Sequence, residues 1–255
     1  MIILLSIALG CAGVQKKKTE ITAQRDALSP EKAYSMRGKI KLRVVIKDKK
    51  MTCTMHYCYD KGQEEFYANF TGPMNKNLGI LHVNKQEIFF YGNELDAYFQ
   101  ADSNGSSFSR LSGLTIEPFS FIGLLQGIFS FPDAIYNKES IDNTYVNRYY
   151  RNGKQWIVEQ RERKGDMLKG VYFYRGEELY TTVVLAYDEA LLYPERVDMF
   201  IHRTGLRIIL EKGKQERLDG SECSKLDLSK YRERDAIDTS SYDAEYPLLL
   251  DLAGQ

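Results

Sequence analysis

The sequence predicts a mainly β protein, formed by one curled antiparallel sheet with a single helical insertion. Short segments of alternating apolar and polar residues recur along most of the chain, and turn residues separate them. One apolar segment, residues 119–131, interrupts this pattern. The 255 residues, of which 43% are hydrophobic, are enough to bury the core of one large domain. About eleven strands with no linker between the two halves favour one sheet over two domains.

The charge balance and the absence of known motifs exclude several classes of protein. The chain has 35 basic and 35 acidic residues, so it offers no net attraction to nucleic acid. Its four cysteines and three histidines match no zinc spacing, and we expect no metal or cofactor. The sequence contains no nucleophile elbow, P-loop or zincin motif, so we expect no enzyme. A catalytic cluster of distant residues, such as His56, Glu64 and His202, stays an alternative.

The N-terminus has the pattern of a targeting segment. Residues 1–10 are uncharged and almost wholly apolar, and ten residues are too few to span a bilayer. They predict a signal peptide that ends at Gly10, and Gly10 before Cys11 resembles the lipobox of bacterial lipoproteins. Cys11 is then the expected lipid attachment site, and residues 11–28 form a tether to the membrane. An ordinary secretory cleavage site and a buried strand are the alternatives. Ala12 favours the outer membrane, at its periplasmic face.

The first half of the folded body, which we expect to extend from residue 29 to 228, is predicted to be a meander of strands. Ser29 and Pro30 predict a short helix that ends near Ser35. Strands are expected at residues 39–47, 51–59, 65–71, 78–83, 87–91 and 95–100. Cys53 and Cys58 are five residues apart, so in a regular strand they face opposite sides and cannot form a disulfide.

The second half begins with the expected helical lid. Residues 119–131 are apolar on nearly every side, which predicts a buried helix that ends before Pro132. Strands resume at Thr144, and Asn152 followed by Gly153 predicts a tight hairpin. Further strands are expected at residues 156–162, 167–174, 179–187, 196–202 and 206–211. Residues 229–255 are expected to form a C-terminal tail.

Side chains on one face of the predicted sheet, and on the helix, form a surface suited to an apolar ligand of variable shape. Flexible thioethers and flat aromatic rings accommodate acyl chains. The alternative is an ordinary filled core. The expected cavity-lining residues are Leu42, Val44, Met55, Tyr57, Phe66, Phe70, Phe90, Phe121, Leu124, Leu125, Ile128 and Trp156.

Several short motifs, in their order along the chain, resemble the LolB family of outer-membrane lipoprotein receptors in the LolA/LolB superfamily. The resemblance covers roughly residues 29–215. It rests on residues 37–40 (Arg-Gly-Lys-Ile), the turn at 71–74 (Thr-Gly-Pro-Met), Tyr91 and Tyr98, the apolar helix, the hairpin at 152–156 (Asn-Gly-Lys-Gln-Trp) and the strands at 193–197 and 208–210. The family's turn reads Pro-Leu-Gly where this chain has Pro-Met-Asn.

The resemblance implies an unclosed antiparallel β-barrel with a helical lid that holds lipoprotein acyl chains. Pro73 and Met74 stand where the family's loop enters the membrane, with Met74 in the place of the inserting leucine. The implied partners are a periplasmic LolA-like carrier and the membrane, and the protein is expected to be a monomer that makes and breaks no bond. The alternative is a structural or protein-interaction envelope lipoprotein with a filled barrel.

Overall fold

The computed structural model describes residues 34–238, apart from 48, 115, 130, 132–133, 189–192, 220–222 and 224–226, together with 242 and 248. The expected signal peptide, Cys11, the tether and almost all of the helix expected from Ser29 lie outside the described residues. The strands are β1 (Met36–Ile46), β2 (Lys49–Asp60), β3 (Glu65–Thr71), β4 (Asn77–Val83), β5 (Glu87–Gly92), β6 (Ala97–Asp102), β7 (Ile135–Ile141), β8 (Tyr145–Asn152), β9 (Gln155–Glu162), β10 (Leu168–Arg175), β11 (Glu178–Ala186), β12 (Arg196–Ile201), β13 (Leu206–Arg217) and β14 (Asp235–Ala236).

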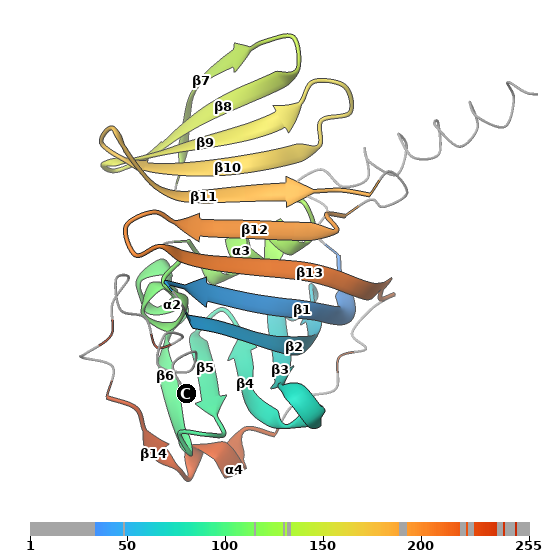
Figure 1. Ribbon diagram of the computed structural model, residues 1–255, viewed down its shortest axis with the longest axis vertical. Helices are drawn as coiled ribbons and strands as arrows, with labels where there is room; N and C mark the ends of the chain where they lie inside the picture. Colours follow the sequence, from blue (N-terminus) through green and yellow to red (C-terminus); the bar gives the residue numbers. More distant parts are fainter. Residues whose placement is uncertain are drawn as a thin grey trace, which may run out of the picture.

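One unclosed sheet contains every strand of the described residues, which confirms the predicted fold class (Figure 1). Its order is β14-β6-β5-β4-β3-β2-β1-β13-β12-β11-β10-β9-β8-β7. All neighbours are antiparallel except β14, which pairs with β6 in parallel through two residues. The two meanders join where β1 pairs with β13 over most of its length, so the sheet has no break between its halves.

The main hydrophobic cluster lies on one face of the sheet, which we call the inner face. In β1 the buried side chains alternate with exposed ones, as a sheet with one covered face requires. Helices α2 (Gly105–Ser112) and α3 (Pro118–Leu125) contribute to the same hydrophobic cluster as the strands, so they cover the inner face (Figure 1). The sequence therefore builds a helical lid over one side of an open sheet.

The structure shortens one predicted element and adds others that were not expected. The lid helix ends at Leu125 rather than at Phe131, because Gly127 adopts a φ of 72°, which a helix cannot continue through. Helix α2 was not expected; it begins where the Asn104 side chain accepts a hydrogen bond from the Ser107 N–H. β7 and β14 were also not expected, and the described chain has fourteen strands where about eleven were predicted.

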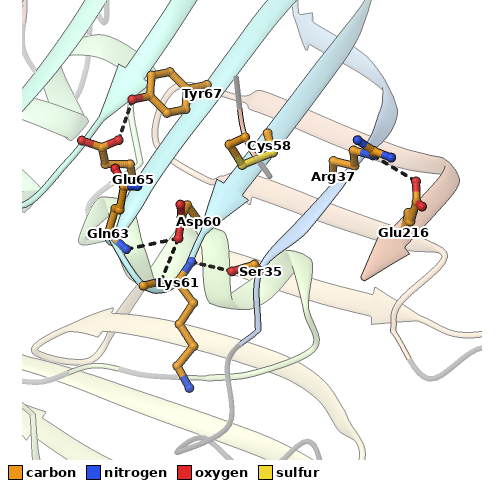
Figure 2. The surroundings of a disulfide bond; sticks show 11 residues. Ser35, Arg37, Cys58, Asp60, Lys61, Gln63, Glu65, Tyr67 and Glu216 are labelled. Atoms are coloured by element: carbon orange, nitrogen blue, oxygen red, sulfur yellow. Dashed lines mark hydrogen bonds and ion pairs between the residues drawn. A yellow bond between two sulfur atoms is a disulfide. The ribbon is translucent and has the colours of Figure 1, made fainter. Parts of the chain in front are cut away.

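A disulfide joins Cys58 on β2 to Cys223, 165 residues later (Figure 2). Cys58 lies between the core residues Tyr57 and Tyr59, so it faces the outer side of the sheet. Cys53 is buried on the inner face and is free, which confirms that Cys53 and Cys58 do not pair. After Cys223 the chain continues to α4 (Ser229–Arg232), where Tyr231 packs on Tyr91 of the outer face.

The disulfide gives the first testable prediction. Its long loop restricts the unfolded chain, so Cys223→Ser is expected to lower the free energy of unfolding by about 3–5 kcal/mol. Urea denaturation of the wild type and the variant, each with and without a reducing agent, measures this change. A reductant should destabilise the wild type and leave Cys223→Ser unchanged. An equal effect of the reductant on both proteins would contradict the assignment of the bond.

Candidate functional site

Most of the predicted cavity-lining residues meet on the inner face. Leu42, Val44, Met55, Tyr57, Phe66, Phe90, Leu124 and Leu125 are buried in one hydrophobic cluster. Phe70 and Phe121 are partly buried and pack against it, and Ile128 is buried. Trp156 does not join the group. It points to the outer face of β9, because its neighbour Ile157 is the residue that enters the core.

The two lid helices pack directly on this cluster. Phe108 of α2 and Phe121 of α3 contact each other with ring centroids 5.5 Å apart. The Gln126 side chain, just after α3, bonds the backbone of Tyr34: its Oε1 accepts from the Tyr34 N–H at 3.3 Å, and its Nε2 donates to the Tyr34 carbonyl at 3.1 Å. The lid is thus fixed to the chain segment that enters β1.

A small apolar cavity remains on the inner face, between β1 to β5 and the turn that follows β5. Its volume is about 60 Å³, which is room for a few water molecules. It is lined by Leu42, Met51, Cys53, Phe70, Leu78, Gly79, Phe90 and Glu94. Burial raises the pKa of the Cys53 thiol to about 11, so this side chain stays neutral and adds no charge to the cavity. In this conformation the space holds no long acyl chain.

The turn between β3 and β4 lies beside the cavity. Leu78, which lines the cavity, also contacts the turn residue Gly72: a Cβ placed on Gly72 would lie 3.2–3.3 Å from its side-chain carbons. The Lys76 ammonium forms an ion pair with Glu94, a second cavity-lining residue. These contacts fix the turn to the rim of the cavity.

Met74 is held at the tip of this turn with its side chain in water. The Gly72 N–H donates to the Lys76 carbonyl at 2.7 Å, and the Lys76 N–H donates to the Pro73 carbonyl at 3.2 Å. These bonds close the turn tightly. Met74 and Asn75 take φ values of 56° and 60°, and the Met74 side chain is 100% exposed. A large apolar side chain that contacts no part of its own protein is available to an apolar partner.

The inner face also holds a buried ion pair that the sequence did not predict. The Arg161 guanidinium donates to Glu159 Oε1 at 2.6 Å, and the Tyr150 hydroxyl donates to Glu159 Oε2 at 2.8 Å. Arg161 also donates to the Asp166 carbonyl at 2.8 Å. Glu159 is 2% exposed and Arg161 is 6% exposed. This polar cluster lies in β8 and β9, away from the apolar cavity lined by residues of β1 to β5.

The described part of the chain contains no group of three or more His, Cys, Asp or Glu residues placed to hold a metal ion. Within that part, no helix is both long and apolar enough to span a bilayer. The residues considered for a catalytic cluster lie on or next to different strands: His56 is on β2, Glu64 precedes β3 and His202 follows β12. His202 instead shares a hydrogen bond of 2.9 Å with Thr182.

No family model and no curated protein sequence matches this chain. Solved structures do. A LolA superfamily protein from Nitrosomonas europaea has a TM-score of 0.53 and 12% identity, over 79% of this chain and 93% of that one. A putative outer membrane lipoprotein-sorting protein domain from Vibrio parahaemolyticus has a TM-score of 0.54 and 15% identity, over 85% and 97%. A DUF1329 family protein from Desulfovibrio piger has a TM-score of 0.53 and 11% identity, over 85% and 96%. These similarities show that the chain shares its fold with these three proteins.

Proposed function

We propose that this chain is a membrane-anchored lipoprotein that binds the acyl chains of other lipoproteins on its inner face and helps insert them into the outer membrane. The observation that carries the proposal is the fully exposed Met74, held on a closed turn at the rim of an apolar cavity. The fold shared with a lipoprotein-sorting domain supports it. Cargo is received from a periplasmic LolA-like carrier, and the protein acts as a monomer without a cofactor.

Binding of an acyl chain requires the lid to move, because the cavity is small. Left-handed glycines, Gly113 with a φ of 79° and Gly127 with a φ of 72°, lie at the end of α2 and just after α3, where small rotations reorient a helix. Moving the lid into water exposes its apolar surface, and this exposure costs about 25 cal/mol of free energy per Å². An incoming acyl chain covers the same surface. The lid therefore stays closed without cargo, and it opens when an acyl chain covers the apolar surface in its place.

The proposed location agrees with the chemistry of the described residues. The Cys58–Cys223 disulfide is typical of a protein outside the reducing cytosol. Residues 1–10 act as the signal peptide, Cys11 carries the lipid, residues 11–28 form the tether and residues 29–228 form the carrier domain. The lipid anchor holds the protein at the periplasmic face of the outer membrane.

Titration with a fluorescent fatty acid tests acyl binding directly. We expect the unacylated variant Cys11→Ser to bind cis-parinaric acid at a saturable site. Cys53→Phe fills the cavity and is expected to weaken this binding about tenfold, because the ring occupies space that the ligand would enter. Thr52→Phe, on the opposite face of the same strand, is the matched control and should bind as the parent does.

The same titration distinguishes the second candidate function, a structural or protein-interaction envelope lipoprotein. The nearly filled inner face favours this candidate. A permanently filled core gives no saturable fatty-acid binding at any concentration. Such a result, obtained with protein whose circular dichroism shows a native β-sheet, would contradict the acyl-carrier proposal.

A further inference from the structure

A groove of about 580 Å³ lies on the outer face of β7 to β10, away from the inner face and its lid. It is the surface to which Trp156 points. The groove is lined by Asn137, Lys138, Asn147, Tyr149, Trp156, Val158, Gln160, Tyr172, Tyr174 and Gly176. None of these side chains contributes to the acyl-binding surface, so the groove needs a separate explanation.

The strand register brings four aromatic rings together in this groove. Trp156 of β9 lies opposite Tyr174 of β10, and Val158 of β9 lies between Tyr149 of β8 and Tyr172 of β10. The Tyr172 ring lies over Gly170, where a Cβ atom would be 3.0–3.1 Å from it. Glycine at 170 thus lets this ring lie close to the sheet. All four rings are half-buried, so each is positioned by the sheet and still accessible.

Amide groups lie next to the rings in a hydrogen-bonded row. Gln160 donates to Asn147 Oδ1 at 3.1 Å, and its own Oε1 accepts from the Tyr172 hydroxyl at 3.3 Å. These bonds orient the two amides and leave the side-chain N–H groups of Asn147 without a partner among the described residues. Oriented amides beside aromatic faces can bond hydroxyl and acetamido groups.

Two cations stand over the rings of the groove. Lys138 Nζ lies 4.9 Å from the Tyr149 ring centroid, and the Arg151 guanidinium carbon lies 5.6 Å from that of Trp156. Within the described chain neither cation forms an ion pair, and no acidic residue lines the groove. The groove is therefore complementary to a ligand that carries negative charge.

We propose that this groove binds an oligosaccharide that contains N-acetylated sugars and carboxylates. The C–H faces of pyranose rings pack on Trp156, Tyr149 and Tyr174, as apolar groups pack on aromatic rings. Neighbouring strands are about 4.8 Å apart, close to the length of one sugar unit, so successive strands can contact successive sugars. The amides bond acetamido and hydroxyl groups, and the two cations bond carboxylates. This binding is independent of the acyl-carrier function.

The single tryptophan of the chain makes the test direct, because Trp156 fluorescence reports from the groove itself. The probes are a hyaluronan hexasaccharide, which alternates N-acetylglucosamine and glucuronate, and neutral chitohexaose. We expect a saturable fluorescence change with hyaluronan and an affinity about tenfold lower for chitohexaose. Lys138→Gln should remove most of this difference.

Calorimetry on variants of the full-length chain completes the test. Trp156→Ala and Tyr174→Ala are each expected to weaken hyaluronan binding by about tenfold or more. Tyr136→Ala is the matched control. Tyr136 lies on the same hairpin but packs against Tyr150, whose hydroxyl donates to the buried Glu159. This variant should bind hyaluronan as the wild type does. Absence of saturable binding, unchanged binding by Trp156→Ala, or equal binding of poly-glutamate would each overturn the proposal.

Discussion

Under the proposed function, the variant Met74→Glu is expected to lose most lipoprotein insertion into a bilayer and to keep the binding of acyl chains. Met74 is fully exposed, so the substitution removes no contact within the protein. Placing a carboxylate instead of a thioether at the apolar boundary of a membrane costs about 2 kcal/mol. That cost corresponds to roughly a 30-fold lower insertion rate.

Transfer of a purified triacylated lipoprotein to vesicles of phosphatidylethanolamine and phosphatidylglycerol measures this effect. Met74→Leu keeps an apolar side chain on the same turn and is the matched control, with transfer near the wild-type rate. Stability of both variants should lie within about 0.5 kcal/mol of the wild type, because the side chain is at the surface. If Met74→Glu transfers lipoproteins as fast as the wild type, the turn has no role in insertion.

The sequence was sufficient to find the Met74 turn but not the face on which Trp156 lies. A Gly-Pro pair that closes a hairpin is local chemistry, and the structure keeps it as a turn with Met74 at its tip. In β9 both faces begin with an apolar residue, Trp156 on one and Ile157 on the other. Alternation therefore does not decide which face is inner, and the buried pair of Glu159 and Arg161 misleads a reading based on hydrophobicity.

Long-range features could not be obtained from the sequence for related reasons. The Cys58–Cys223 bond depends on where the chain passes after β13, which no local pattern records. β7 has seven exposed residues and is paired on one side only, so it lacks the alternation that identifies a half-buried strand. The filling of the inner face depends on how α2 and α3 pack, and the apolar composition of residues 119–131 fits both a closed lid and an open one.

A loss of stability as large as that of Cys223→Ser is expected from Arg161→Met. This variant leaves the Glu159 carboxylate buried, with the Tyr150 hydroxyl as its remaining partner among the hydrogen bonds described above. Breaking a buried pair in this way destabilises a protein by about 3–5 kcal/mol, because one charge stays without compensation. In a chain of this size the midpoint of thermal unfolding should fall by about 10 °C. Urea and thermal denaturation of the purified variant measure both quantities.

Two further variants distinguish two causes of this loss of stability: the uncompensated buried charge and the missing arginine side chain. Glu159→Met combined with Arg161→Met removes both charges, so it should regain most of the stability lost by the single variant. Lys85→Gln breaks an exposed ion pair with Glu64 and should cost less than about 1 kcal/mol. If the double variant were as unstable as Arg161→Met, the loss would come from the Asp166 carbonyl contact and side-chain packing instead. The cluster would then act by fixing the β9–β10 turn.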